Sequence, residues 1–185
     1  MNPASTQPLE PARADDDGAT GQEPLVLTCG ELGWPPIRRL LERYGLELRA
    51  VADGAEMPGS YWGAPEAGLV GRAVIARSDT PVHSLLHEAC HAICCDEQRR
   101  QTLDTEAGGD DAEENGVCYL QIVLGGLLPG ASRERLQLDM DRWGYSFRLG
   151  STRAWFEEDA EDARAWLVQH GLLTTAGQPI YRLRP

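Results

Sequence analysis

The sequence contains no lysine, and all 17 of its basic residues are arginines. The 29 acidic residues outnumber them, which leaves a formal net charge of −12. A chain of this charge is repelled by phosphate backbones and by anionic lipid surfaces. We therefore expect no nucleic-acid partner and no membrane partner.

Long apolar runs are also missing. No segment approaches the roughly 18 consecutive apolar residues that a membrane-spanning helix requires. Residues 1–20 have neither an apolar core nor a basic start, so they do not resemble an export signal. The five cysteines do not have the spacing of a secreted disulfide framework. These absences predict a cytoplasmic protein with reduced thiols.

The composition changes near residue 25. Residues 1–24 are rich in Pro, Ala, Asp, Ser, Thr and Gly. Such a segment cannot bury enough apolar surface to offset the entropy of ordering, so we expect a disordered tail. Residues 25–185 are long enough for one sizeable core and are expected to form a single domain. Within it, residues 131–185 are expected to make a helical C-terminal extension.

Hydrophobic spacing and turn residues predict a helix first, then strands, then several helices. This order is typical of an α+β fold. Thr80 and Pro81 predict the start of a central helix, with Thr80 as its N-cap. The expected helices are 35–45, 81–95, 112 to 124 or 128, 132–143 and 157–169, and the expected strands are 46–51, 69–77 and 179–183.

The central helix carries the most informative motif. His87, Glu88 and His91 form the pattern HExxH. Residues four apart lie on one face of a helix, so both imidazoles can reach one metal ion. Glu88 is rotated by about 100° from His87, so it can stand beside the metal and take a proton from a metal-bound water. An apolar stripe on the same helix can face the core: Val82, Leu86, Ala89 and Ile93.

A catalytic zinc site has three protein ligands and one open position. The third ligand is expected on the following helix, where Asp110, Asp111, Glu113 and Glu114 are candidates. We prefer Glu113, because it heads an apolar row that would bury against the first helix. Glu114 heads a more polar row and stays the alternative.

These residues resemble the gluzincin group of zinc metallopeptidases, and more narrowly the small ImmA/IrrE-type metallopeptidases. In that family a strand precedes the HExxH helix, and a glutamate ligand opens a second helix that ends at Leu-Leu-x-Pro or similar. The matching features here are 69–77, His87–His91, Glu113 and Leu127-Leu128-Pro129. The resemblance covers about residues 37–129.

The resemblance implies a zincin-like fold, in which a small mixed or antiparallel sheet packs on the HExxH helix and on the Glu-bearing helix. It implies one Zn²⁺ per chain, bound by His87, His91 and Glu113. It also implies hydrolysis of a peptide or protein substrate, with Glu88 as general base. An extended substrate would then pair with the strand before the helix.

Other residues near the motif allow two interpretations. His83 lies one turn before His87 and could assist the chemistry, although such a histidine more often lines a helix start. Three cysteines near the two helices are expected to pack in the core: Cys90, Cys94 and Cys118. Four aromatic residues are candidates for a pocket wall or a transition-state hydrogen bond, but are more often ordinary core or surface residues: Tyr61, Trp62, Tyr119 and Tyr145.

Two functional alternatives remain open at this point. The first is a catalytically silent, metal-binding regulatory or protein-interaction module of zincin-like fold, in which residues 131–185 serve a partner. The second is an accidental motif that binds no metal.

Overall fold

The computed structural model describes residues 25–105 and 107–185, and in these the chain has a mixed α+β fold of eight helices and one three-stranded sheet. The α+β class expected from the sequence is therefore confirmed. The expected disordered tail, residues 1–24, lies outside the described residues. No helix among the described residues is long and apolar enough to cross a membrane.

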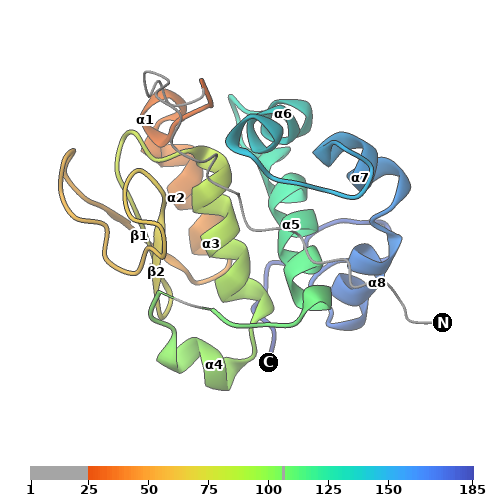
Figure 1. The fold of residues 1–185 in the computed structure, drawn as a ribbon. Helices are drawn as coiled ribbons and strands as arrows, with labels where there is room; N and C mark the ends of the chain where they lie inside the picture. Colours follow the sequence, from red (N-terminus) through yellow and green to blue (C-terminus); the bar gives the residue numbers. More distant parts are fainter. Residues whose placement is uncertain (1–24, 106) are drawn as a thin grey trace.

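The elements follow one another along the chain as labelled in Figure 1. They are α1 (Cys29–Leu32), α2 (Trp34–Arg43), β1 (Glu47–Ala50), β2 (Gly68–Val70), β3 (Ala73–Ala76), α3 (Val82–Cys94), α4 (Glu97–Thr102), α5 (Asp111–Gly125), α6 (Arg133–Trp143), α7 (Thr152–Glu158) and α8 (Glu161–Gln169).

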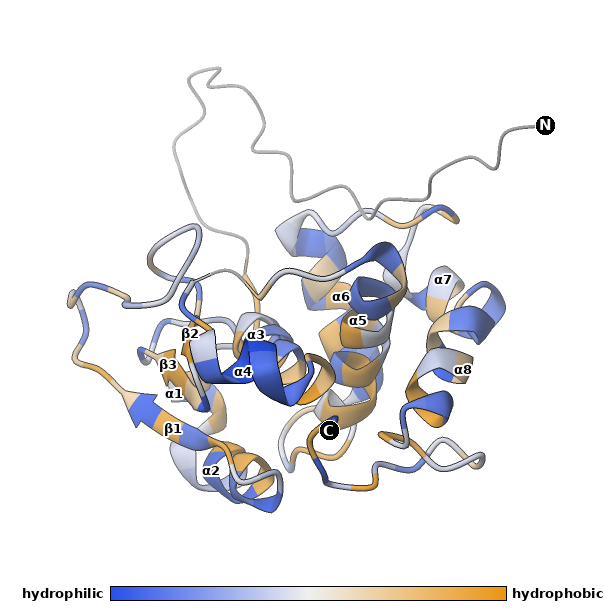
Figure 2. Cartoon of the chain, turned by 90° about the horizontal axis from the view of Figure 1, so that it is seen from below, coloured by the Kyte–Doolittle hydropathy of each residue, from blue (hydrophilic) through white to orange (hydrophobic). Residues whose placement is uncertain are grey.

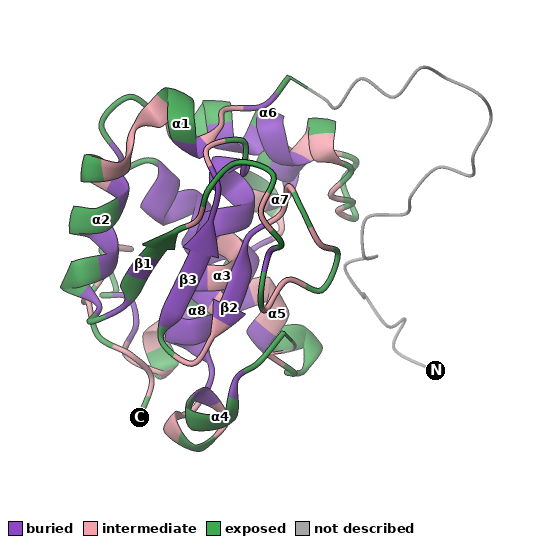
Figure 3. Cartoon of the chain, turned by 90° about the vertical axis from the view of Figure 1, so that its left-hand side faces the viewer, coloured by how far each residue is buried: buried purple, intermediate pink, exposed green. Residues whose placement is uncertain are grey.

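The sheet has the order β1-β3-β2, with β1 parallel and β2 antiparallel to the central β3. Leu48, Val74 and Leu69 lie side by side across the three strands and are all buried. They belong to the same core as the apolar residues of α3. Figure 3 shows the sheet lying against α3, with β3 buried throughout, β2 mostly buried and β1 mostly exposed.

The single strand expected at 69–77 is wrong, because the chain turns at Gly71 and forms the hairpin β2–β3. Gly71 has a φ of 58°, which glycine adopts at little cost. The strand directly before α3 is therefore central and has no free edge. The expectation that a substrate pairs with that strand is wrong for this chain. The outer edge of β2 is also partly occupied, because the Leu69 carbonyl accepts a hydrogen bond from the Thr105 amide.

The helices α3 and α5 stand side by side in the middle of the molecule, with the sheet on one side and α6 to α8 on the other (Figure 1). Both are rich in apolar residues, whereas α4 is hydrophilic along its length (Figure 2). The α3 positions expected to face the core are all fully buried: Val82, Leu86, Ala89 and Ile93. The predicted apolar face of this helix is thus confirmed.

Three further boundaries differ from expectation. Thr80 is not the N-cap of α3, since its hydroxyl accepts from the Arg77 amide and Pro81 takes the cap position. The helix expected at 157–169 is broken near Asp159 into α7 and α8. The segment expected as a strand at 179–183 makes only one isolated bridge, from Pro179 to Leu173.

Candidate metal centre

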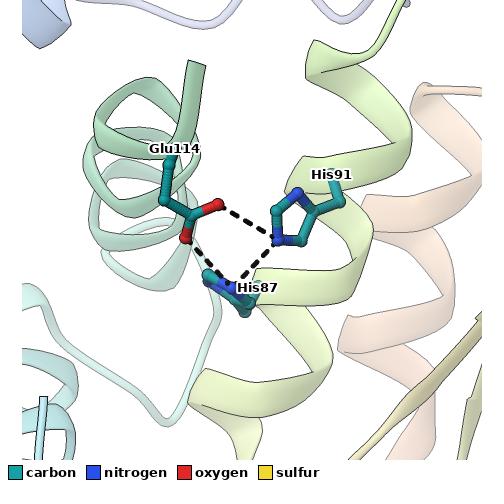
Figure 4. Close-up of side chains that lie close together, drawn as sticks. All are labelled: His87, His91 and Glu114. Atoms are coloured by element: carbon teal, nitrogen blue, oxygen red, sulfur yellow. Dashed lines mark hydrogen bonds and ion pairs between the residues drawn. The ribbon is translucent and has the colours of Figure 1, made fainter. Parts of the chain in front are cut away.

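The candidate site lies between α3 and α5. His87 and His91 project from successive turns of α3, and Glu114 projects toward them from the first turn of α5 (Figure 4). Among the described residues, these three form a group whose ligand atoms all lie within 4.8 Å of one another. The group can hold a metal ion.

The three side chains form a small triangle. The Nε2 atoms of His87 and His91 are 3.0 Å apart. The Glu114 carboxylate spans both rings, with Oε1 3.4 Å from His87 Nε2 and Oε2 3.5 Å from His91 Nε2. The side chains are only 15–32% exposed, so the triangle is sheltered from solvent but still reachable.

Glu113, the third ligand preferred from the sequence, is not part of this group. Its carboxylate forms ion pairs with Arg99 and Arg184, and its side chain is 5% exposed. Consecutive helical residues point about 100° apart, so α5 can direct only one of the two glutamates at the histidines. The structure brings Glu114, the alternative, to that position and corrects the prediction.

Asp110 and Asp111 do not reach the histidines either. Asp110 is the N-cap of α5, where its side chain accepts from the Glu113 amide at 2.9 Å. Asp111 is exposed in the first turn of the helix. Acidic residues at these positions stabilise a helix through its dipole. Both therefore help to start α5 rather than to bind a metal.

Gln121 orients His87. Its Oε1 lies 2.7 Å from His87 Nδ1 and can only accept, so Nδ1–H donates this hydrogen bond. The lone pair of Nε2 is then directed at the centre of the triangle. Such partners commonly fix the tautomer of metal-binding histidines. Sequence analysis missed Gln121, although it lies two turns after Glu114 on the polar row of α5.

The charges of the site favour a cation. Burial, together with His87, lowers the pKa of His91 to about 4, so this imidazole is neutral at pH 7 and does not repel a cation. Burial alone would raise the pKa of Glu114, but the two imidazoles and the Cys118 thiol outweigh it and lower this pKa. The centre therefore combines a neutral imidazole with an ionised carboxylate.

Glu88 lies beside the triangle on α3 and is half-buried. Burial raises its pKa to about 7, and nearby Glu66 and Glu114 act in the same direction against the effect of His87. A carboxylate with this pKa can both accept and release a proton near neutral pH. Its placement and pKa suit a general base.

Tyr145 and Trp143 lie against the histidines of α3. The Tyr145 ring centroid lies 6.0 Å from that of His87 and 5.6 Å from that of His83. The Trp143 ring centroid lies 5.3 Å from that of His83, and the Trp143 indole N–H donates a hydrogen bond to Glu66. Tyr145 is thus the one of the four aromatic candidates with a ring contact to His87.

The other candidates lie elsewhere or serve the core. Tyr61 and Trp62 contact each other in an exposed loop, and Tyr119 stacks on Phe156. The three cysteines near the helices are free and buried, as expected for core residues: Cys90, Cys94 and Cys118. None of them joins the group of described residues that could hold a metal ion.

Comparison with known proteins adds no neighbour to this description, since no protein-family model, no curated protein and no solved structure matches the chain. Any functional conclusion therefore depends on the geometry and chemistry of the site.

Proposed function

We propose that this protein is a zinc-dependent metallopeptidase of zincin-like fold. In this proposal His87, His91 and Glu114 bind one Zn²⁺, and Glu88 is the general base in the hydrolysis of a peptide or protein substrate. The observation that carries it is the triangle of ligand atoms between α3 and α5.

The size of the triangle supports zinc. Zinc binds histidine nitrogen and carboxylate oxygen at about 2.0–2.2 Å, and a tetrahedral arrangement then separates two ligand atoms by about 3.3–3.6 Å. Here the two histidine Nε2 atoms are 3.0 Å apart, slightly closer than this, and each lies 3.4 or 3.5 Å from a different oxygen of the Glu114 carboxylate. Three protein ligands also match a catalytic zinc site, in which the fourth position is open.

The order of the elements supports the zincin-like part of the proposal. A strand hairpin precedes the HExxH helix, and a glutamate in the first turn of the next long helix reaches the histidines. This is the arrangement that the resemblance to gluzincins implies. Glu114 takes the role for which the sequence favoured Glu113.

In this proposal zinc and Glu88 have different roles in hydrolysis. When bound, zinc would acidify a water molecule and polarise the scissile carbonyl. Glu88 accepts the proton of the attacking water and passes it to the leaving amine. Its raised pKa fits both steps, because the carboxylate is neither too weak a base nor too weak an acid near pH 7.

Metal content tests the first part of the proposal. We expect about one zinc per chain in the wild type, and loss of that zinc in His87→Ala and Glu114→Gln. Glu113→Gln is the matched comparison, since it leaves all three proposed ligands in place and should still bind about one zinc per chain when zinc is in excess, although its affinity should fall with the loss of the ion pairs to Arg99 and Arg184. Elemental analysis of the purified proteins measures this. Zinc lost in Glu113→Gln but kept in Glu114→Gln would contradict the assigned ligand set.

Peptide cleavage tests the second part. Zinc-loaded wild type should cleave members of a broad peptide library, and Glu88→Gln should bind zinc normally but cleave at least about 100-fold more slowly. If the wild type binds zinc and cleaves nothing, the peptidase proposal fails. The silent, metal-binding module would then be the better description. If the wild type binds no zinc at all, the whole proposal fails.

A further inference from the structure

The C-terminal end of α3 is capped by two arginines, Arg100 from the next helix and Arg184 from the end of the chain. The last carbonyls of any helix lack intrahelical partners. Here Arg100, which is 1% exposed, donates to the Ala92 and Cys95 carbonyls. The main-chain amide of Arg184 donates to the Ile93 carbonyl at 2.9 Å.

Arg100 also binds the segment that contains Arg184, and Arg184 binds α3 a second time. Arg100 donates to the Arg184 carbonyl at 2.8 Å, and the Arg184 side chain donates to the Cys94 carbonyl at 3.2 Å. The segment 181–185 is thus held against the C-terminal end of the helix that carries His87 and His91. Figures 1 and 2 show the C-terminus at this end of α3.

The same Arg184 side chain reaches the second ligand helix. Its Nη1 lies 2.9 Å from Glu113 Oε2, in an ion pair whose carboxylate is 5% exposed. Arg99, from α4, pairs with the other oxygen of Glu113. Arg184 therefore joins the end of α3 to the first turn of α5.

Glu113 is the immediate neighbour of Glu114. The first turn of a helix frays most easily, and a rotation of this turn about its axis would move Glu114 away from the histidines. The buried ion pairs of Glu113 oppose such a rotation. A buried, doubly paired carboxylate has few alternative positions, because leaving its partners would expose an uncompensated charge to a poorly solvated environment.

From these contacts we infer that Arg184 is a positioning residue for the metal centre, and that docking of the segment 181–185 is coupled to metal binding. The inference depends on the proposed metal site and deepens it. Arg184 touches none of the three ligands. It acts by holding Glu113, and through Glu113 the rotational setting of Glu114.

Coupling of this kind is reciprocal. If the docked segment favours the arrangement that binds a metal, then the metal must favour the docked segment by the same free energy. Zinc should therefore slow hydrogen exchange of the Arg184 amide, which is bonded to the Ile93 carbonyl. A segment that opens locally and is not coupled to the metal would exchange at the same rate with and without zinc.

The test combines this exchange measurement on the wild type with zinc affinities of three variants. Arg184→Ala should weaken zinc binding about tenfold, the lower end of the effect of residues that support metal ligands. Arg184→Lys, which keeps one charge for Glu113, should recover part of the loss. Arg182→Ala is the matched control, since Arg182 donates to the Gly171 carbonyl and touches neither ligand helix. The visible spectrum of the cobalt-substituted protein reports whether the geometry of the site changes.

The outcomes separate the two proposals. Slower exchange with zinc, weaker binding in Arg184→Ala and recovery in Arg184→Lys support the coupling. A wild type that binds zinc, with unchanged exchange and with Arg184→Ala binding equally well, overturns the coupling but leaves the metal site intact. A wild type that binds no zinc overturns both. If Arg184→Ala does not fold, the exchange measurement on the wild type still decides.

Discussion

Gln121 lies outside the proposed ligand set but contacts one of its members, His87. His87 can offer Nε2 to a metal only if its proton resides on Nδ1, and the Gln121 oxygen 2.7 Å away holds it there. Without that acceptor the ring is free to rotate and to take the other tautomer. The role of Gln121 is therefore specific, because its oxygen determines which nitrogen of His87 carries the proton.

Replacing Gln121 tests this directly. Gln121→Leu should weaken zinc binding by about 10- to 100-fold, because the hydrogen bond that orients His87 is lost. Gln121→Glu keeps an acceptor at this position and should retain more of the affinity. Competition with a chromogenic chelator measures both. Equal affinities in Gln121→Leu and the wild type would contradict the role of Gln121.

His83 is a buried histidine that makes the stability of the fold depend on pH. It is 1% exposed, and neither ring nitrogen has a hydrogen-bond partner among the described residues. Burial, with a smaller contribution from His87, lowers its pKa from 6.5 to about 3. The unfolded chain therefore takes up a proton at this residue between about pH 6.5 and 3, whereas the folded chain does not.

The sign of the pH effect follows. The contribution of His83 is complete above pH 6.5 and is lost as the pH falls, by about 1.4 kcal/mol per unit. His83→Phe keeps a ring against Trp143 and removes the titration. Between pH 7 and 4.5, the wild type should therefore lose about 2–3 kcal/mol more free energy of unfolding than the variant. Urea unfolding of the metal-free proteins at both values measures this, and parallel losses would contradict it.

At the scale of elements, the rotation of α5 decides which glutamate faces the histidines. The apolar row that begins at Glu113 is indeed buried, as expected from its spacing: Val117, Leu120 and Leu124. Glu113 continues that row into a region where Arg99 and Arg184 supply its charge partners. The sequence reasoning placed this face of α5 correctly but did not foresee the arginines. The polar row beginning at Glu114 therefore faces the site.

The loop before β2 depends on two glycines with different surroundings. Gly54 and Gly59 both have positive φ, 78° and 71°. A Cβ at Gly54 would meet nothing within 4 Å, whereas a Cβ at Gly59 would lie 2.6 Å from the Leu69 carbonyl oxygen. The Gly59 carbonyl also accepts from the Leu69 amide.

Alanine at these positions separates conformational strain from steric conflict. Gly54→Ala should cost about 1 kcal/mol, from the left-handed backbone alone. Gly59→Ala should cost about 1–3 kcal/mol more, because the obstacle is main chain and cannot turn aside. Denaturant unfolding of both variants measures the difference. Equal costs would show that the loop moves freely away from β2.

At the scale of the whole molecule, all five cysteines are free and buried: Cys29, Cys90, Cys94, Cys95 and Cys118. Burial is the largest cause that raises the pKa of each thiol, to about 12 for Cys29. Protonated thiols react poorly with alkylating and disulfide reagents. The core therefore protects them in two ways, by excluding the reagent and by suppressing the thiolate.

Thiol labelling checks this at pH 8. All five thiols should react rapidly in denaturant, and the native protein should react at least about 100-fold more slowly, because labelling then requires opening of the fold. Mass spectrometry counts the labels. A thiol that reacts rapidly in the native protein would show that its part of the core opens readily.

Local sequence determined the parts of this protein that depend on neighbours along the chain. The spacing of HExxH places His87 and His91 on one face of a helix, and the apolar period of that helix identifies its buried side, whatever surrounds it. The same local signals indicated α2, α3, α5 and α6 and the α+β class.

Only the tertiary structure decided the features that join distant segments. Arg184 lies 71 positions from Glu113, yet their ion pair belongs to the setting in which Glu114 faces the histidines. Gln121 lies 34 positions from His87 and orients its ring. The pairing of β3 on both sides removes the free edge expected beside α3. The spacing of residues along a helix determines which of them share a face. The rotation of one helix against another is determined by contacts between distant segments, which no local pattern contains.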